Sequence, residues 1–227
     1  MMDLSTFPEY FRKYEWRAKH ALFGYPADRY REFRWIKHLE SRAAWLRDEI
    51  VGGSDTSGFY LVKDIIRRGG SQNGCLQKFE DGIGRICLSE KIAQVVTSLA
   101  QPQAAISAAM AIPGLGLTYG SKLLRFLKPT CFGALDRRVR SALTAERPNA
   151  PSGSVMPEMS DYNAVSAYVL FCKFTSDLMH QLEANGIARP ECELIPNSTD
   201  TQWRAADVEM ALFQWAATVN TKPRARD

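Results

Sequence analysis

The sequence predicts an all-α protein, and three observations carry this prediction. Apolar side chains recur at helical spacing along most of the chain, as Phe7, Tyr10, Phe11 and Tyr14 do near the N-terminus. Glycine, proline and helix-capping residues stand where these helices would begin or end. No stretch has the alternating pattern that is typical of strands. The 227 residues are 45% hydrophobic and 24% charged, the composition of an ordinary globular protein that can bury a sizeable core.

In the N-terminal half, residues 7–50 are predicted to form helices rich in aromatic side chains and arginine. Asp55 or Ser54 can cap the next helix, which is expected to end at the glycine pair 69–70. Residues 71–84 are polar and rich in glycine, and they are predicted to form a loop.

The C-terminal half carries a stronger helical pattern. Ser89 can cap a helix over residues 90–100, and Asp136 lies where an N-cap belongs for a helix through Leu143. Residues 148–159 are rich in proline and serine, which predicts an exposed loop. The remaining predicted helices span residues 102–111, 117–127, 162–184 and 203–219.

Composition also excludes several classes of protein. No apolar run approaches the roughly 18–20 residues that cross a bilayer, and Met1–Tyr10 lacks the basic and apolar regions of a signal peptide. The five cysteines are scattered, with none at CxxC spacing, and only three histidines accompany them. A zinc site or an iron–sulfur cluster is therefore not expected. We expect a cytoplasmic monomer with no membrane partner, no metal and no organic cofactor.

Positive charge is concentrated in one part of the chain. Residues 111–147 hold seven cationic and two anionic side chains, a net charge of +5, whereas the rest of the chain has 22 cationic and 23 anionic side chains. A basic segment on a neutral body is typical of proteins that bind a polyanion. The alternative is a solvated helix face.

The segment Ile112-Pro113-Gly114-Leu115-Gly116 lies between two predicted helices. Its glycines allow a tight turn in which successive backbone N–H groups face one phosphate. The next helix directs its positive N-terminal end toward the same phosphate. Such a helix-hairpin-helix holds a DNA backbone without reading its sequence. We therefore predict that Pro113, Gly114, Leu115 and Gly116 bind DNA; the alternative is an ordinary turn between helices.

Asp136 lies one helix and one loop beyond this hairpin, directly before a basic helix. This arrangement, over residues 112–143, resembles the helix-hairpin-helix DNA glycosylases, the superfamily of endonuclease III, the adenine-mismatch glycosylases and the 8-oxoguanine glycosylases. The resemblance implies a two-lobed helical fold with the active cleft between the lobes and Asp136 as the catalytic residue. It divides the chain into an N-terminal helical region contributing to the second lobe (1–88), a helix-hairpin-helix catalytic core (89–147) and C-terminal helices completing the fold and the base pocket (148–227).

The chemistry explains why an aspartate is needed. Cleavage of an N-glycosidic bond builds positive charge on the sugar. A fixed carboxylate beside the sugar stabilises that charge and can orient or deprotonate a water. At a helix N-cap a carboxylate accepts backbone N–H bonds, which favour its ionised form. Asp136 could instead serve only as an N-cap, and it is the adjoining hairpin that favours catalysis.

The lyase branch of this family has a nucleophilic lysine two residues after the second hairpin glycine, where this chain has Thr118. A hydroxyl group cannot form a Schiff base with the sugar, so we predict a monofunctional glycosylase that leaves an abasic site. Lys122 lies one helical turn further along the same face. It is predicted either in the base pocket, where residual lyase activity would follow, or against phosphate or solvent.

Glu209 and Phe213 are four residues apart in the C-terminal segment EMALF. In the 8-oxoguanine branch, a glutamine and a phenylalanine in a similar segment hydrogen-bond to the extruded base and stack on it. A glutamate keeps only acceptors when it is ionised, which suits a base that offers an amino group, such as cytosine. The alternative is a core Phe213 beside a surface Glu209.

The glycine-rich stretch also holds the polar pair Gln72-Asn73. A surface turn is the simpler interpretation of this pair. The alternative is insertion into DNA at the point that the extruded base has left.

Together these features predict an enzyme that acts on double-stranded DNA containing a modified base. The chain resembles small prokaryotic proteins of 8-oxoguanine-glycosylase fold, some of which remove glucosylated hydroxymethylcytosine from viral DNA in phage defence. That base is the substrate we expect. The alternatives are an 8-oxoguanine-type repair glycosylase, a non-catalytic helix-hairpin-helix DNA-binding protein, and a helical scaffold. The further predicted DNA contacts are Thr118, Arg125, Arg137 and Arg138.

Overall fold

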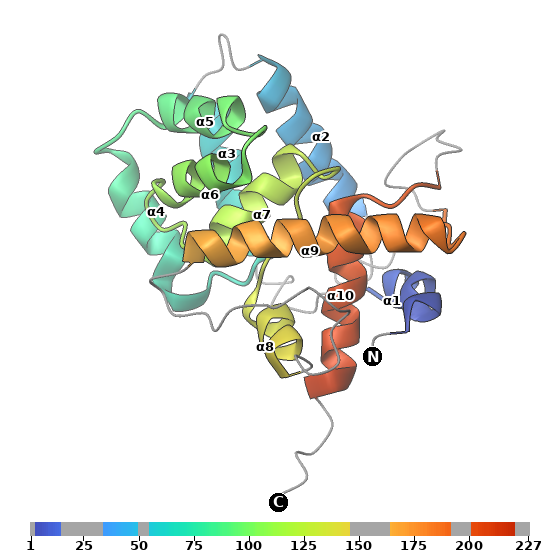
Figure 1. Ribbon diagram of the computed structural model, residues 1–227. Helices are drawn as coiled ribbons and strands as arrows, with labels where there is room; N and C mark the ends of the chain where they lie inside the picture. Colours follow the sequence, from blue (N-terminus) through green and yellow to red (C-terminus); the bar gives the residue numbers. More distant parts are fainter. Residues whose placement is uncertain (1–2, 15–33, 50–54, 146–163, 192–200, 221–227) are drawn as a thin grey trace, which may run out of the picture.

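The computed structural model describes residues 3–14, 34–49, 55–145, 164–191 and 201–220, and within them the fold is all-α, as predicted (Figure 1). These ranges contain no strand, and no helix in them is long and apolar enough to cross a membrane. In the same ranges, the 3-10 helices Leu4–Thr6 and Gln72–Gly74 accompany the α-helices. The α-helices are α1 (Phe7–Arg12), α2 (Arg34–Glu49), α3 (Asp55–Arg68), α4 (Cys75–Ile83), α5 (Leu88–Thr97), α6 (Pro102–Met110), α7 (Leu117–Leu127), α8 (Arg137–Ala145), α9 (Ala164–Ala184) and α10 (Ala205–Asn220).

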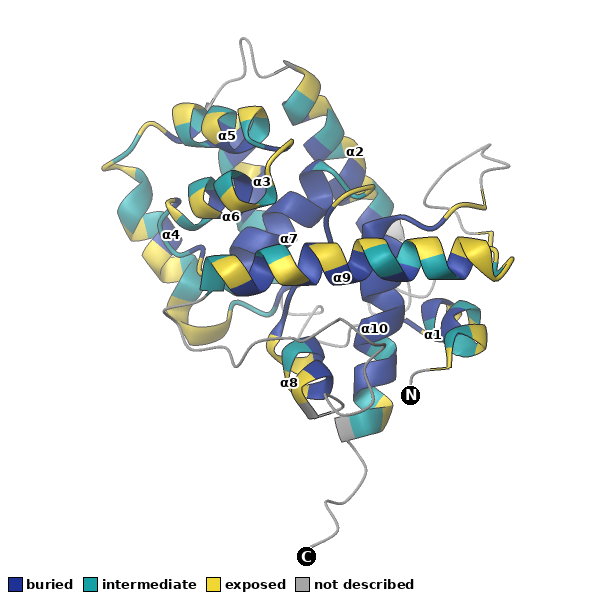
Figure 2. Ribbon diagram, in the orientation of Figure 1, coloured by how far each residue is buried: buried dark blue, intermediate teal, exposed yellow. Residues whose placement is uncertain are grey.

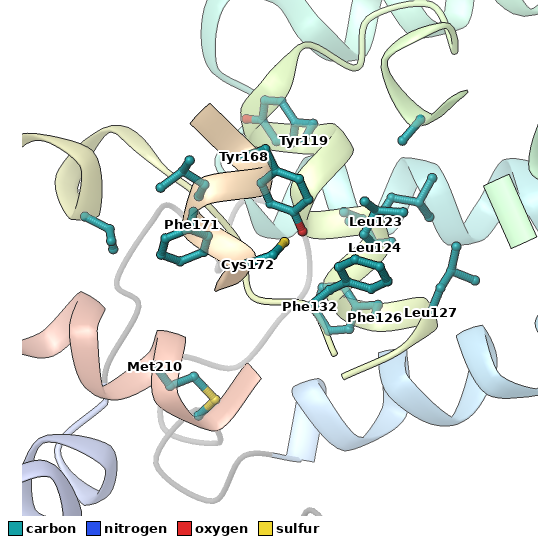
Figure 3. Packing of buried hydrophobic residues seen from close by; sticks show 14 of the residues in the cluster. Tyr119, Leu123, Leu124, Phe126, Leu127, Phe132, Tyr168, Phe171, Cys172 and Met210 are labelled. Atoms are coloured by element: carbon teal, nitrogen blue, oxygen red, sulfur yellow. The ribbon is translucent and has the colours of Figure 1, made fainter. Parts of the chain in front are cut away.

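Helix α7 is the centre of the fold, and Figure 2 shows it buried along most of its length. Helices α2, α3, α6 and α9 pack around it. Its apolar side chains lie on one half of the helix, yet Ser121, Lys122 and Arg125 on the opposite half are buried as well. Lys122 and Arg125 belong to this helix and are buried with it, so their charges need partners inside the protein. Figure 3 shows part of the core around α7: Leu123, Leu124, Phe126, Leu127, Phe132, Tyr168 and Phe171.

Helix α10 is a second buried helix, and it packs against α1, α8 and α9. Just before it, the indole of Trp203 meets the rings of Phe7 and Phe11 edge-on, with centroids 6.3 and 5.8 Å apart. The turn before α8 is tied to the start of α10, because the Ala206 N–H donates to the Pro129 carbonyl at 3.0 Å. These contacts set α8 beside α10, and the start of α8 lines the candidate site.

The predicted hairpin is present between α6 and α7, and glycine is required in it. Gly114 has φ +77°, and a Cβ at this position would lie 2.5 Å from the Cys75 carbonyl oxygen and 2.8 Å from the Phe79 nitrogen. Pro113 in turn packs where a Cβ on Gly82 would lie, at 2.4 Å. Any side chain at Gly114 would therefore push the hairpin off α4.

The prediction of a loop over residues 71–84 is wrong for most of its length, because Cys75–Ile83 forms α4. Phe79 anchors this helix: it is fully buried and stacks on Phe59 with centroids 5.5 Å apart. Tertiary packing thus overrides the weak helical preference of the glycines.

The other predicted helices in the described ranges are present, with ends that differ by up to three residues: α5 ends at Thr97 and not at residue 100, and α10 begins at Ala205 and not at residue 203. Ser89 is not an N-cap, because α5 begins one residue earlier at Leu88, after Cys87. The predicted loop 148–159 lies outside the described residues. The other predicted helices correspond to α6, α7, α9 and α10.

Candidate active site

A pocket of about 460 Å³ opens where the end of α3, the first turns of α7 and the start of α8 meet. It contains five of the residues that the sequence nominated: Thr118, Lys122, Asp136, Arg137 and Arg138. The lining of the pocket also includes Gly69, Gln72 and Ser141.

Asp136 is held rigidly at the N-cap of α8, as predicted. Its Oδ1 accepts the Val139 backbone N–H at 2.9 Å, and the residue is only 7% exposed. The preceding residue is tied to α7, since the Leu135 N–H donates to the Ser121 hydroxyl oxygen at 2.9 Å. The carboxylate therefore serves as a helix cap and as part of the pocket wall at once, and its position is fixed from both α7 and α8.

Lys122 brings a buried amine to the same pocket. Its side chain is 7% exposed, and Nζ lies 5.2 Å from the centroid of the Tyr119 ring. Burial lowers the pKa of Lys122 to about 8, although the nearby carboxylate of Asp136 favours the charged form. The amine thus remains mostly protonated at neutral pH and loses its charge within a mildly alkaline range.

Glu209 and Phe213 of α10 lie behind the pocket wall and do not line the pocket in this structure. Glu209 is 4% exposed, and its Oε2 is 3.7 Å from Nε of Arg125. Burial raises the pKa of Glu209 to about 7; Arg125 opposes this rise and the charge of Asp136 adds to it. Glu209 is therefore a buried residue, in contrast to the surface alternative, and its charge is coupled to that of Asp136.

The prediction that Arg125 contacts DNA phosphates is wrong, because the side chain is enclosed by the core. Arg125 is 2% exposed, and it donates to Oε1 of Glu40 at 3.0 Å and to the sulfur of Met210 at 3.3 Å. Its guanidinium also lies 4.5 Å above the Phe126 ring. A buried cation needs such partners, and a surface phosphate cannot reach it.

A chain of buried ion pairs runs from Arg125 away from the pocket, and sequence reasoning missed it. Glu40 of α2 bridges Arg125 and Arg204, accepting from Arg204 at 2.8 Å. Arg204 also binds both oxygens of Asp207, at 2.9 and 2.7 Å, and Arg189 lies 3.4 Å from that carboxylate. The sequence does offer one local indication of this chain, because Arg204 and Asp207 are three residues apart at the start of a predicted helix.

The turn that carries Gln72 into the pocket has an unusual backbone. Ser71 and Asn73 have φ of 48° and 58°, a region that costs energy for residues other than glycine. The hydroxyl of Tyr119 fastens this turn, since it accepts from the Gln72 N–H at 3.0 Å and donates to the Gly69 carbonyl at 3.2 Å. Gln72 and Asn73 are thus exposed on a surface turn, the simpler interpretation of the sequence, and Gln72 also lines the pocket.

Comparison with protein families, with curated proteins and with solved structures finds no match for this chain. Among the described residues, no group of three or more His, Cys, Asp or Glu side chains could hold a metal ion. What the site offers chemically is a fixed carboxylate and a buried amine in one pocket, with two exposed arginines, Arg137 and Arg138, at its rim.

Proposed function

We propose that this protein is a DNA glycosylase that extrudes a modified base and hydrolyses its N-glycosidic bond, leaving an abasic site. One observation carries the proposal: the carboxylate of Asp136, fixed at an N-cap, lines a pocket directly beside a helix-hairpin-helix turn. Asp136 is the catalytic residue, and it stabilises the positive charge that develops on the sugar as the bond breaks.

The hairpin supplies the grip on the DNA backbone. Gly116 is the N-cap of α7, so the first N–H groups of that helix are available to a phosphate. Arg137 and Arg138 are exposed in the first turn of α8 and add positive charge at the pocket rim. Thr118 lies at the pocket in the first turn of α7, between these two groups of contacts.

Lys122 and Glu209 influence the charge around Asp136. Burial lowers the pKa of Lys122 to about 8, and the carboxylate of Asp136 favours the charged form of this amine. Thr118 occupies the position of the lyase nucleophile in the related enzymes, so the enzyme is monofunctional. Glu209 contributes its charge from behind the wall and biases the pocket toward a base that donates hydrogen bonds.

We further propose a hypermodified cytosine, such as glucosylated hydroxymethylcytosine of phage DNA, as the base that is excised. The volume of about 460 Å³ is within the roughly 300–1,000 Å³ of sites that enclose a whole small molecule. We also propose that the helices form the two lobes of a glycosylase. In Figure 1, α2 to α7 gather on one side, α1, α8 and α10 on the other, and α9 extends across both.

The proposal is tested by release of free bases from a panel of duplexes, read by mass spectrometry. The panel contains 8-oxoguanine, uracil, alkylated purines and phage DNA with plain or glucosylated hydroxymethylcytosine. Asp136→Asn should lower turnover by about 100- to 1,000-fold and leave DNA affinity unchanged. Asparagine is also a good N-cap, so the variant should fold.

Asp48→Asn is the matched control, because Asp48 is an exposed aspartate of α2 whose side chain is 64% exposed. It should retain full turnover. Release of 8-oxoguanine alone would replace the proposed substrate by a repair substrate. DNA binding without release of any base would identify a non-catalytic binding protein and leave Asp136 as a helix cap.

A further inference from the structure

The pocket has an exposed rim and a buried part, and the two differ in chemistry. Arg137 and Arg138 are exposed at the rim. Lys122 and Asp136 line the same pocket, and each is only 7% exposed. A nucleotide that enters the pocket therefore keeps its phosphates near the arginines, and it brings its sugar and base to the buried amine and carboxylate.

The amine of Lys122 has a defined position in the pocket. Its Nζ lies 5.2 Å from the centroid of the Tyr119 ring. A Cβ on Gly69 would lie 3.0 Å from this Nζ and 2.4 Å from Cε1 of the ring, so the glycine leaves room for both groups. The Tyr119 hydroxyl donates to the Gly69 carbonyl at 3.2 Å and ties the ring to the end of α3. The ammonium group is thus held between a ring and a glycine that fix where its protons can go.

The surroundings of this amine suit a proton donor. Burial lowers the pKa of Lys122 to about 8; Asp136 and Glu209 favour the charged form, whereas Arg68 and Arg125 disfavour it. The amine is therefore still protonated at neutral pH, and it releases its proton more readily than an exposed lysine does. A pKa near the working pH is the property that makes a general acid efficient.

A departing base needs such a proton. When the N-glycosidic bond breaks, both electrons of the bond go to the base, and a cytosine that leaves as an anion is a poor leaving group. Asp136 acts on the sugar as an ionised carboxylate, so it has no proton to give. We propose that Lys122 is the general acid of the reaction, and that its ammonium group protonates the departing base. This inference rests on the proposed function and adds a second catalytic residue to it.

The protons balance over one turnover. The bond between C1′ and the base nitrogen breaks, and Lys122 gives one proton to the base and becomes a neutral amine. The oxygen of a water molecule bonds to C1′, and the proton that this water loses passes to Asp136. Transfer of that proton to the amine through solvent restores both residues. The products are the free base and an abasic site, and no covalent bond forms between Lys122 and the sugar.

The first test is base release under single-turnover conditions, measured by mass spectrometry on phage DNA that carries glucosylated hydroxymethylcytosine. Lys122→Met keeps an unbranched side chain but has no proton to donate, and it should lower the rate constant by at least about 100-fold. Its affinity for a duplex with a tetrahydrofuran abasic analogue, measured by fluorescence anisotropy, should stay near wild type. Lys173→Met, at an exposed lysine of α9, is the matched control and should keep both values.

The second test changes only how tightly the amine holds its proton, because Lys122→Met also removes a positive charge from beside Asp136. Thialysine at position 122 has a sulfur in place of one methylene, which makes the amine more acidic. The wild-type rate constant should fall as the pH rises through about 8, and thialysine should move this fall to lower pH. Burial raises the pKa of both Cys75 and Tyr119, so neither accounts for the fall. Glu209→Gln should retain it, because Glu209 titrates at about 7.

The outcomes separate the general acid from the function on which it rests. Wild-type release by Lys122→Met, or a pH profile that thialysine does not move, overturns the general acid and leaves the glycosylase proposal standing. A covalent complex with DNA that sodium borohydride traps through Lys122 also overturns it, because the amine would then attack the sugar. Absence of base release by the wild-type protein from every duplex of the panel overturns the proposed function itself.

Discussion

Glu209→Gln tests how the protein holds a buried carboxylate behind its pocket. Burial raises the pKa of Glu209 from 4.5 to about 7, even though Arg125 favours the charged form. Between these two values the folded protein binds more protons than the unfolded chain does. Its stability therefore falls as the pH rises through this window. Glutamine has the shape of the protonated side chain and cannot ionise, so the substitution should remove this pH dependence.

The size of the effect follows from the two pKa values. A difference of about 2.5 corresponds to about 3 kcal/mol of unfolding free energy. Above pH 7 the variant should be more stable than the wild type by up to about 3 kcal/mol, and below pH 4.5 the two should converge. For a chain of this length, that gain raises Tm by roughly 6–12 °C. Arg125 keeps its contact with Glu40 at 3.0 Å and is not left alone.

The assay is urea unfolding followed by far-UV circular dichroism, from pH 4 to pH 8.5. Glu183→Gln is the control, because Glu183 is an exposed glutamate of α9, and its profile should follow that of the wild type. If Glu209→Gln is instead less stable than the wild type at pH 8, the ion pair with Arg125 outweighs the cost of burial. That result would refute the reasoning about the charge behind the pocket.

Two further predictions concern the scaffold of the site. Glu40→Gln removes the negative charge that two buried arginines share, and it should lower the free energy of unfolding by about 3–5 kcal/mol. The control Asp48→Asn, at an exposed residue, should change this free energy by less than about 0.5 kcal/mol. A Glu40→Gln protein as stable as the wild type would exclude a structural role for the ion-pair chain. Tyr119→Phe removes both hydrogen bonds from the Tyr119 hydroxyl to the strained turn. The Gln72 amide should then lose its protection from hydrogen exchange, while amides in the core keep theirs. Unchanged protection at Gln72 would show that the turn holds its shape without the hydroxyl.

The hairpin and the Asp136 cap could be predicted from the sequence because both are local. A proline and two glycines fix the turn, and an aspartate before a helix is a cap whatever surrounds it. The same reliance on local pattern explains why a loop was wrongly predicted where the structure has α4. The glycines and the amide side chains near Gln72 predict a loop, whereas the deciding contact is the distant packing of Phe79 against Phe59.

The charges show the limit of sequence reasoning more clearly. The basic segment predicts that Arg125 contacts phosphates at the surface, whereas its partner Glu40 is 85 residues away along the chain. Arg204 is 164 residues from the same carboxylate. No local sequence pattern predicts ion pairs between residues so far apart in the chain. The pattern of α7 indicates the opposite of what the structure shows: its apolar residues lie on one half of the helix, which predicts that Arg125 on the other half faces solvent.

The most direct test of the central claim is the release of free base from phage DNA that carries glucosylated hydroxymethylcytosine, measured by mass spectrometry with wild type beside Asp136→Asn. We predict that the wild-type protein releases the modified base, leaves abasic sites in an intact strand, and loses this activity in the variant. Equal release by both proteins would contradict the catalytic role of Asp136. No release from this DNA or from any duplex of the panel would contradict the assignment as a glycosylase.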